Sequence, residues 1–161
     1  MRPLPLVAGL MALPTLALAT SLVPHTLLQR AEQSDRVALV QVLSQKVEET
    51  GNAKIPLKTY TRVLIGQNLR GTGPEEVTIV QIGGRLGLQS IEVPGDASFR
   101  VGETAVVFMR CRLAPDRCHL VAMGAGKLDV EGDSVFVQDL SNGKWARRTV
   151  KSLVAELAVS R

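Results

Sequence analysis

The stretch that decides the fold is Val106-Val107-Phe108-Met109-Arg110-Cys111, followed after a short gap by Cys118-His119-Leu120-Val121-Ala122-Met123. Both segments are mainly apolar, and Ala114-Pro115-Asp116 between them is typical of a turn. The pattern predicts a β-hairpin. Facing positions near a hairpin end bring side chains within about 5 Å, so we expect Cys111 and Cys118 to form a disulfide. Closing so small a loop would stabilise the protein by roughly 2–3 kcal/mol.

Further strands are expected on both sides of this hairpin. Residues 37–43 are almost continuously apolar, which suits a buried strand. Residues 57–65 alternate between two faces, and residues 77–82 form a third strand. Gly132-Asp133 and Asn142-Gly143 are dipeptides typical of tight turns between strands. Seven or eight short strands indicate a mostly antiparallel barrel or sandwich.

A short helix is expected at each end of these strands. Thr26-Leu27-Leu28-Gln29 has the N-cap and N3 residues of a capping box, which predicts a helix to about Ser34. Thr149 can cap a second helix near the C-terminus. The expected apolar faces are Leu27, Leu28 and Ala31 in the first helix, and Val150, Leu153, Val154, Leu157 and Ala158 in the second.

The N-terminus has the pattern of a secretory signal peptide. A short positive start precedes apolar residues 4–16, and Ala17-Leu18-Ala19 matches the small-x-small cleavage pattern. We expect cleavage before Thr20, so that residues 1–19 are the signal and residues 20–161 form a single domain. An uncleaved membrane anchor would need about 20 apolar residues, and this run is shorter and interrupted by prolines. The mature protein is therefore expected to be secreted or periplasmic, and not embedded in a membrane.

The sequence offers no recognisable catalytic or cofactor motif. Gly124-Ala125-Gly126-Lys127 resembles part of a phosphate loop, but Leu128 stands where a Ser or Thr would hold magnesium, so a turn is favoured. His25 and His119 are the only histidines, and neither has a second ligand at metal spacing. Cys118 has an expected disulfide partner, which argues against a catalytic thiol. We assign no catalytic residue, no cofactor and no metal ligand.

Two segments are candidates for binding. Residues 83–98 are rich in glycine and are predicted to form a long loop with at most a little strand. Arginines bracket the cysteine hairpin, and they form either a solvated face or a contact for an anionic envelope polymer. Nucleic acid is disfavoured, because no aromatic platform lies among the basic residues. The candidate residues are Gly83, Gly84 and Arg85 in the loop, and Arg110, Arg112 and Arg117 in the basic patch.

Six segments carry a family resemblance: Arg62–Gly71, Glu76–Gly84, Val93–Gly95, Phe99–Glu103, Val106–Phe108 and Gly124–Lys127. With them, the chain from about Thr26 to Val130 resembles an uncharacterised group of secreted bacterial proteins. That group is similar to the oligonucleotide/oligosaccharide-binding (OB) barrel of tissue inhibitors of metalloproteinases and netrin-like domains. The resemblance implies a small OB-like barrel. Those inhibitors chelate the protease zinc through an N-terminal cysteine, and this chain has no cysteine before Cys111, so that mechanism does not carry over.

These observations favour a non-enzymatic binding module of the periplasm or cell exterior that recognises a protein or an anionic envelope polymer. The alternative is an inhibitor of a secreted protease that acts through its loops. A third possibility is a carboxylate-dependent hydrolase, which a cleft holding two carboxylates would favour. The oligomeric state is left open.

Overall fold

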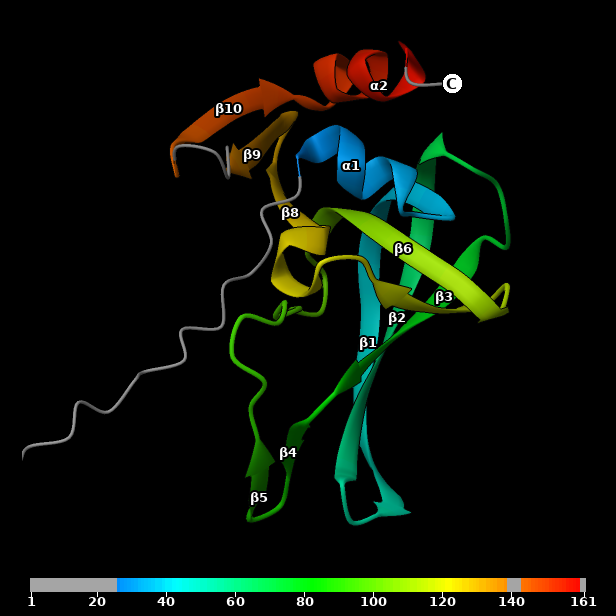
Figure 1. The fold of residues 1–161 in the computed structure, drawn as a ribbon, viewed down its shortest axis with the longest axis vertical. Helices are drawn as coiled ribbons and strands as arrows, with labels where there is room; N and C mark the ends of the chain where they lie inside the picture. Colours follow the sequence, from blue (N-terminus) through cyan, green and yellow to red (C-terminus); the bar gives the residue numbers. More distant parts are fainter. Residues whose placement is uncertain (1–25, 139–142, 160–161) are drawn as a thin grey trace, which may run out of the picture.

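The computed structural model describes residues 26–138 and 143–159. Helix α1 (Leu27–Glu32) and helix α2 (Val150–Val159) lie at the two ends of this part of the chain, with strands between them (Figure 1). The protein is therefore mostly β, as the sequence predicts. The strands are β1 (Arg36–Asn52), β2 (Ile55–Arg70), β3 (Glu76–Ile82), β4 (Gly84–Leu86), β5 (Gln89–Ile91), β6 (Thr104–Ala114), β7 (Arg117–Leu120), β8 (Lys127–Glu131), β9 (Ser134–Gln138) and β10 (Trp145–Thr149), and the short 3-10 helix η1 (Met123–Gly126) precedes β8.

Five strands pair in a ring-like sheet. Their order is β1-β2-β3-β7-β6, and β6 also pairs with β1. These pairings are antiparallel except for the short parallel contact of β3 with β7, where Ile79 faces Cys118. β1 pairs with both β2 and β6, and its register with β2 shifts after Val37, Leu39 and Val42. Such bulges bend a strand, which lets β1 follow the curve of the ring. Outside the ring, β8, β9 and β10 continue from β6.

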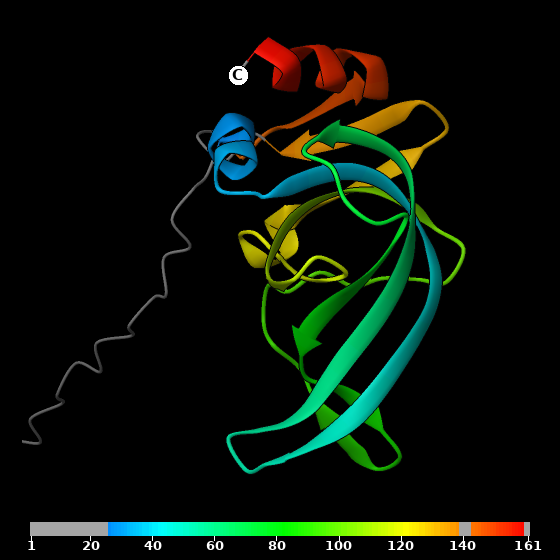
Figure 2. The ribbon, with the colours of Figure 1, turned by 90° about the vertical axis from the view of Figure 1, so that its right-hand side faces the viewer.

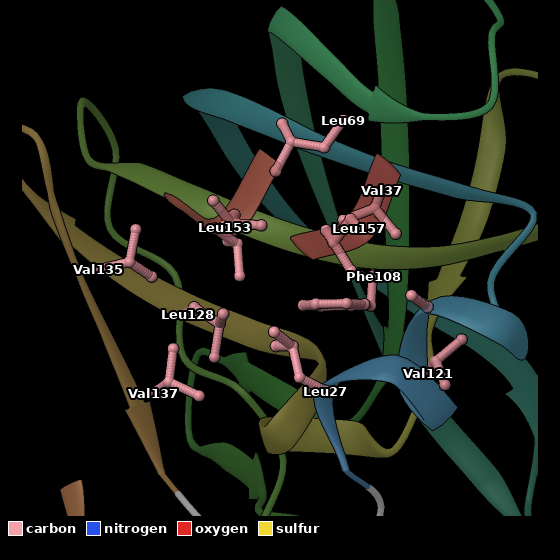
Figure 3. Close-up of a cluster of buried hydrophobic side chains, with 12 residues drawn as sticks. Leu27, Val37, Leu69, Phe108, Val121, Leu128, Val135, Val137, Leu153 and Leu157 are labelled. Carbon is pink, nitrogen blue, oxygen red and sulfur yellow. The ribbon is translucent and has the colours of Figure 1, made fainter. Parts of the chain in front are cut away.

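The first part of β1, up to Val42, and the first part of β6, up to Met109, contact a core on each face, which explains why these segments are almost continuously apolar. Val40 and Val107 pack in a cluster with residues of β2, β3 and β7. Their neighbours Val37 and Phe108 pack in a second cluster, between the other face of these strands and the helices. Figure 3 shows this second cluster, with Phe108 among leucines of both helices. Two cores thus share the same two strands.

Both helices are capped as the sequence predicts. The Thr26 hydroxyl accepts a hydrogen bond from the Gln29 amide (3.2 Å), and the Gln29 side chain accepts one from the Thr26 amide (2.9 Å). In α2, the Ser152 amide donates to the Thr149 hydroxyl (3.1 Å). The prediction that Leu28 is buried is wrong: it is 37% exposed. In so short a helix the buried face is formed by residues three and four apart, namely Leu27, Arg30 and Ala31.

Other predicted boundaries need smaller corrections. β2 continues to Arg70 rather than ending at Ile65, because β1 pairs with it along that whole length. The segment from Gly83 to Ser98 contains the short β4–β5 hairpin, within the little strand that was expected. The predicted signal peptide and Asn142 lie outside the described residues. Within the described part of the chain, no helix has the length and hydropathy needed to cross a membrane.

Candidate functional site

A groove of about 620 Å³ lies where β1, β2 and β3 extend past the strands that close the ring. One wall is made of these three strands, and the other is made of residues 83–85, 91–93 and 96–99. In Figures 1 and 2, the β1–β2 hairpin and the β4–β5 hairpin both extend away from the helices at this end of the molecule. The candidate residues Gly83, Gly84 and Arg85 all line this groove.

Gly83 and Gly84 bring the loop into close contact with the sheet. Gly83 has φ +91°, and a Cβ there would lie 2.4 Å from the Ile91 carbonyl oxygen. Gly84 has φ +129°, and a Cβ there would lie 2.5 Å from the Thr59 hydroxyl and 2.9 Å from Val47. Only glycine combines this backbone conformation with so close an approach. The predicted loop therefore begins with a tightly packed corner.

Side-chain and backbone hydrogen bonds fix this loop against the strands. The Gly83 amide donates to the Leu57 carbonyl (2.9 Å), and the Thr59 hydroxyl donates to the Gly83 carbonyl (2.8 Å). Further along, the Gln81 side chain donates to the Ala97 carbonyl (2.7 Å). Both ends of the loop are therefore tied to β2 and β3. The groove is pre-formed, as binding sites usually are.

The charged side chains of the groove are mostly acidic. Of the described residues that line it, Arg85 is the one basic residue, and Glu92 and Asp96 are acidic. One oxygen of Asp96 accepts a hydrogen bond from the Ala97 amide (2.8 Å), so this carboxylate also shapes the loop. A groove with two carboxylates and one guanidinium does not favour a polyanion.

A buried ion pair supports the floor of the groove. Phe99 is buried and lines the groove, and the Lys127 ammonium lies 5.2 Å from the centre of its ring. The Lys127 side chain is only 9% exposed and pairs with Glu103 at 2.9 Å and with Asp129 at 2.6 Å. Sequence reasoning treated Lys127 only as part of a turn. The sequence does not indicate the contact of Lys127 with Phe99 and Glu103, because these residues lie far apart along the chain. They come together when β8 pairs with β6.

Exposed apolar side chains lie at this end of the molecule. Ile82 lines the groove and is 51% exposed, and Leu86 and Leu88 in the β4–β5 hairpin are 40% and 105% exposed. A smaller hollow of about 260 Å³ lies between the two hairpin tips and is lined in part by Pro56 and Gln89. Exposed apolar groups gathered beside a concave surface are typical of a contact surface.

The predicted basic patch lies on the β6–β7 hairpin, and none of its residues lines the groove. Arg110 is half-buried and donates two hydrogen bonds to the Gln33 carbonyl (3.2 and 3.0 Å). Arg112 and Arg117 are exposed. Arg110 therefore has a structural role, and the surface available to an anion is smaller than the sequence suggests.

Cys111 and Cys118 face each other on β6 and β7 at disulfide distance, with their Cα atoms 4.1 Å apart. The flanking pairs, Arg110 with His119 and Met109 with Leu120, give the register that the sequence predicts. The Cys111 amide also donates to the Asp35 carboxylate (2.8 Å). The hairpin is thus tied to the start of β1.

Arg30 is a buried cation that the sequence did not single out. It is 2% exposed, lies 5.3 Å from the centre of the Phe108 ring and donates a hydrogen bond to the Ala125 carbonyl. Burial lowers the pKa of its guanidinium, because the charged form loses water. Arg30 lies in the core beneath α1, so it joins α1 to η1 and does not form part of the groove.

Among the described residues, no group of three His, Cys, Asp or Glu side chains is placed to hold a metal ion. Comparison with known proteins finds no family model that matches the chain and no curated protein with significant sequence similarity to it. A functional assignment therefore depends on the geometry and chemistry of the groove.

Proposed function

We propose that the protein is exported and acts as a non-enzymatic binding module whose groove receives a segment of a partner protein. The observation that carries this proposal is the pre-formed groove beside exposed apolar residues of the β3 end and the β4–β5 hairpin. Exposed Ile82, Leu86 and Leu88 have no evident role in either core, since both core clusters lie elsewhere. Apolar anchors beside a concave site are what protein recognition uses.

The strand order supports an OB-like barrel as the scaffold. Five strands pair in a cycle. Counted along the chain, the third and the fifth of these strands are β3 and β7, and these two are parallel. OB barrels commonly bind ligands through the face of their second and third strands and the neighbouring loops. Thr59 of β2 and Gln81 of β3 line the groove, so the candidate site lies on the corresponding strands.

Two features support action outside the cytoplasm. The first nineteen residues have the composition of a secretory signal, with Ala17-Leu18-Ala19 at the expected cleavage point. Cys111 and Cys118 lie at disulfide distance, and disulfides persist in oxidising compartments. The proposed location is the periplasm or the cell exterior.

The charges of the groove favour a protein over an anionic polymer. The groove has one arginine and two carboxylates, whereas a polyanion site would need clustered cations. Arg112 and Arg117 could meet a polyanion, but they lie on the β6–β7 hairpin outside the groove. Binding of an anionic polymer would therefore be weakened by substitutions on the β6–β7 hairpin, whereas binding of a protein would be weakened by substitutions in the groove.

The test is a pull-down from envelope and culture supernatant with the purified mature protein as bait. Arg85→Ala and Leu88→Ser are expected to abolish capture of the partner while leaving thermal unfolding nearly unchanged, because both side chains are exposed. Arg112→Ala is the matched control and should capture normally. Capture that survives the groove substitutions but is lost with Arg112→Ala, or is reversed by salt, would assign binding to the basic patch instead.

One observation favours a second candidate function. Glu92 and Asp96 both line the groove, and two carboxylates in a cleft are the arrangement expected of a carboxylate-dependent hydrolase. Hydrolysis of envelope glycans or peptides that disappears with either Glu92→Gln or Asp96→Asn would establish this function. Turnover that persists in both variants, or no turnover, would leave binding as the function of the groove.

A further inference from the structure

Along a long stretch of one edge of β1, no strand of the described part of the chain pairs with it. Up to Gln41 it pairs with β6, and the amide and carbonyl of Val42 bond to Glu103 and Gly102 at 2.9 and 2.8 Å. From Leu43 to Asn52, no backbone–backbone hydrogen bond among the described residues crosses this side of β1, although β2 pairs with its other side. We call this segment the outer edge of β1. Its length is about 30 Å at roughly 3.3 Å per residue.

An uncovered edge of this length is a template for another strand. Native edges are often protected by charged side chains, which repel a second copy where like charges face each other. On the outer edge of β1 the two signs occur side by side. Lys46 and Glu48 lie two residues apart on one face of β1 and form an exposed ion pair of 2.8 Å. The hydrogen bond and negative charge of Glu48 raise the pKa of Lys46. This face of the edge therefore carries one charge of each sign, and Glu49 lies on the opposite face, where a register centred on Val47 would set it against Gln45 of a second copy.

The spacing of these charges selects a second copy of the chain in one register. A two-fold axis perpendicular to the sheet keeps like faces together, so an antiparallel register must be centred on a residue. A register centred on Lys46 would place Lys46 opposite Lys46 of the second copy, and one centred on Glu48 would place Glu48 opposite Glu48. Centring on Val47 places Lys46 opposite Glu48 of the second copy, and Glu48 opposite its Lys46. This register also overlaps nearly the whole edge.

We propose that the outer edge of β1 pairs with the same edge of a second copy, in antiparallel register centred on Val47. The contact is isologous, so each opposite-charge pair occurs twice. Opposite charges facing each other across strands stabilise the pairing, and like charges oppose it. Because the two-fold axis keeps like faces together, the two grooves lie on the same side of a continuous sheet. The pairing does not depend on what the groove binds.

The test measures self-association by analytical ultracentrifugation of protein purified from a secreting host. Lys46→Glu and Glu48→Lys each place like charges in both facing pairs, so each variant should self-associate at least about tenfold more weakly than wild type. An equimolar mixture of these two variants restores opposite charges in both pairs. We expect the mixture to form a heterodimer as tight as the wild-type dimer.

Lys54→Glu is the matched control, because it makes the same charge change in the β1–β2 turn, beyond the outer edge. It should dimerise like wild type, and circular dichroism should show that all variants are folded. A monomeric wild type at every concentration would overturn the proposal. So would a dimer that Lys46→Glu does not weaken, or single variants that fail to associate on mixing.

Discussion

Replacing Lys127 with methionine tests whether the buried ion pair supports the groove. Methionine keeps most of the volume of the lysine stem but removes the ammonium that meets Glu103 at 2.9 Å and Phe99 at 5.2 Å. Removing one partner of a fully buried pair costs about 3–5 kcal/mol, because the other charge is left unpaired. Glu103 is 22% exposed and regains some water, so we expect the free energy of unfolding to fall by about 2–3 kcal/mol.

Urea denaturation and thermal unfolding measure this loss. For a domain of this size, about 1 kcal/mol corresponds to roughly 3–4 °C, so Tm should fall by about 6–12 °C. Adding Glu103→Gln to the Lys127→Met variant should recover part of the loss, since the unpaired charge is then removed. Asp129→Asn is the control: Asp129 also contacts Lys127 but is 71% exposed, so its loss should cost less than about 1 kcal/mol.

Two results would refute this reasoning. One is a Lys127→Met variant within about 0.5 kcal/mol of wild type, which is the range of ordinary surface substitutions. The other is a double variant whose losses simply add, because additivity would mean that the two residues are not coupled. Either result would show that Phe99 is held by packing alone.

Three further predictions follow from the groove, the hairpin and the N-terminus. Gly84→Ala should lower the free energy of unfolding by about 1–3 kcal/mol and abolish partner capture, whereas Gly87→Ala, also at positive φ but with open space around its Cβ, should cost less and keep capture. Peptide mapping without reductant should show Cys111 linked to Cys118, and their replacement by serine should cost about 2–3 kcal/mol without unfolding the protein; two free thiols would contradict this. The intact mass of secreted protein should match a start within a few residues of Thr20, and recovery of full-length chain in membranes would overturn the export proposal.

The features predicted well from the sequence are those that depend on nearby residues. The caps at Thr26 and Thr149, the turn at Gly132-Asp133 and the register of the cysteine hairpin all follow from contacts within a few positions. Ring closure could not be predicted in this way. It depends on β1 pairing with β6 and on the short contact of β3 with β7, and neither leaves a local pattern.

The candidate site was predicted in part, for a related reason. Gly83, Gly84 and Arg85 were candidates because they lie in a glycine-rich predicted loop with Arg85 as its basic residue, and all three line the groove. The close approach of Gly84 to Thr59 was not foreseen, because it depends on how the loop folds back on β2. Arg110 was assigned to a binding patch from its charge alone, whereas its partner is a carbonyl far away in the sequence.

The length of β1 connects the groove to the uncovered edge. Ring closure needs only the part of β1 up to Val42: the pairing with β6 ends at Gln41, and Val42 bonds to Gly102 and Glu103 just before β6. Beyond that point β1 continues to Asn52 beside β2, and neither core cluster includes a residue from Leu43 to Asn52. The same continuation supplies Gln45 and Val47 to the groove and presents Lys46 and Glu48 along the edge. Strand residues that neither close the ring nor fill a core gain little from folding, so their contribution is expected in binding. Substitutions here should therefore change recognition or self-association far more than the free energy of unfolding.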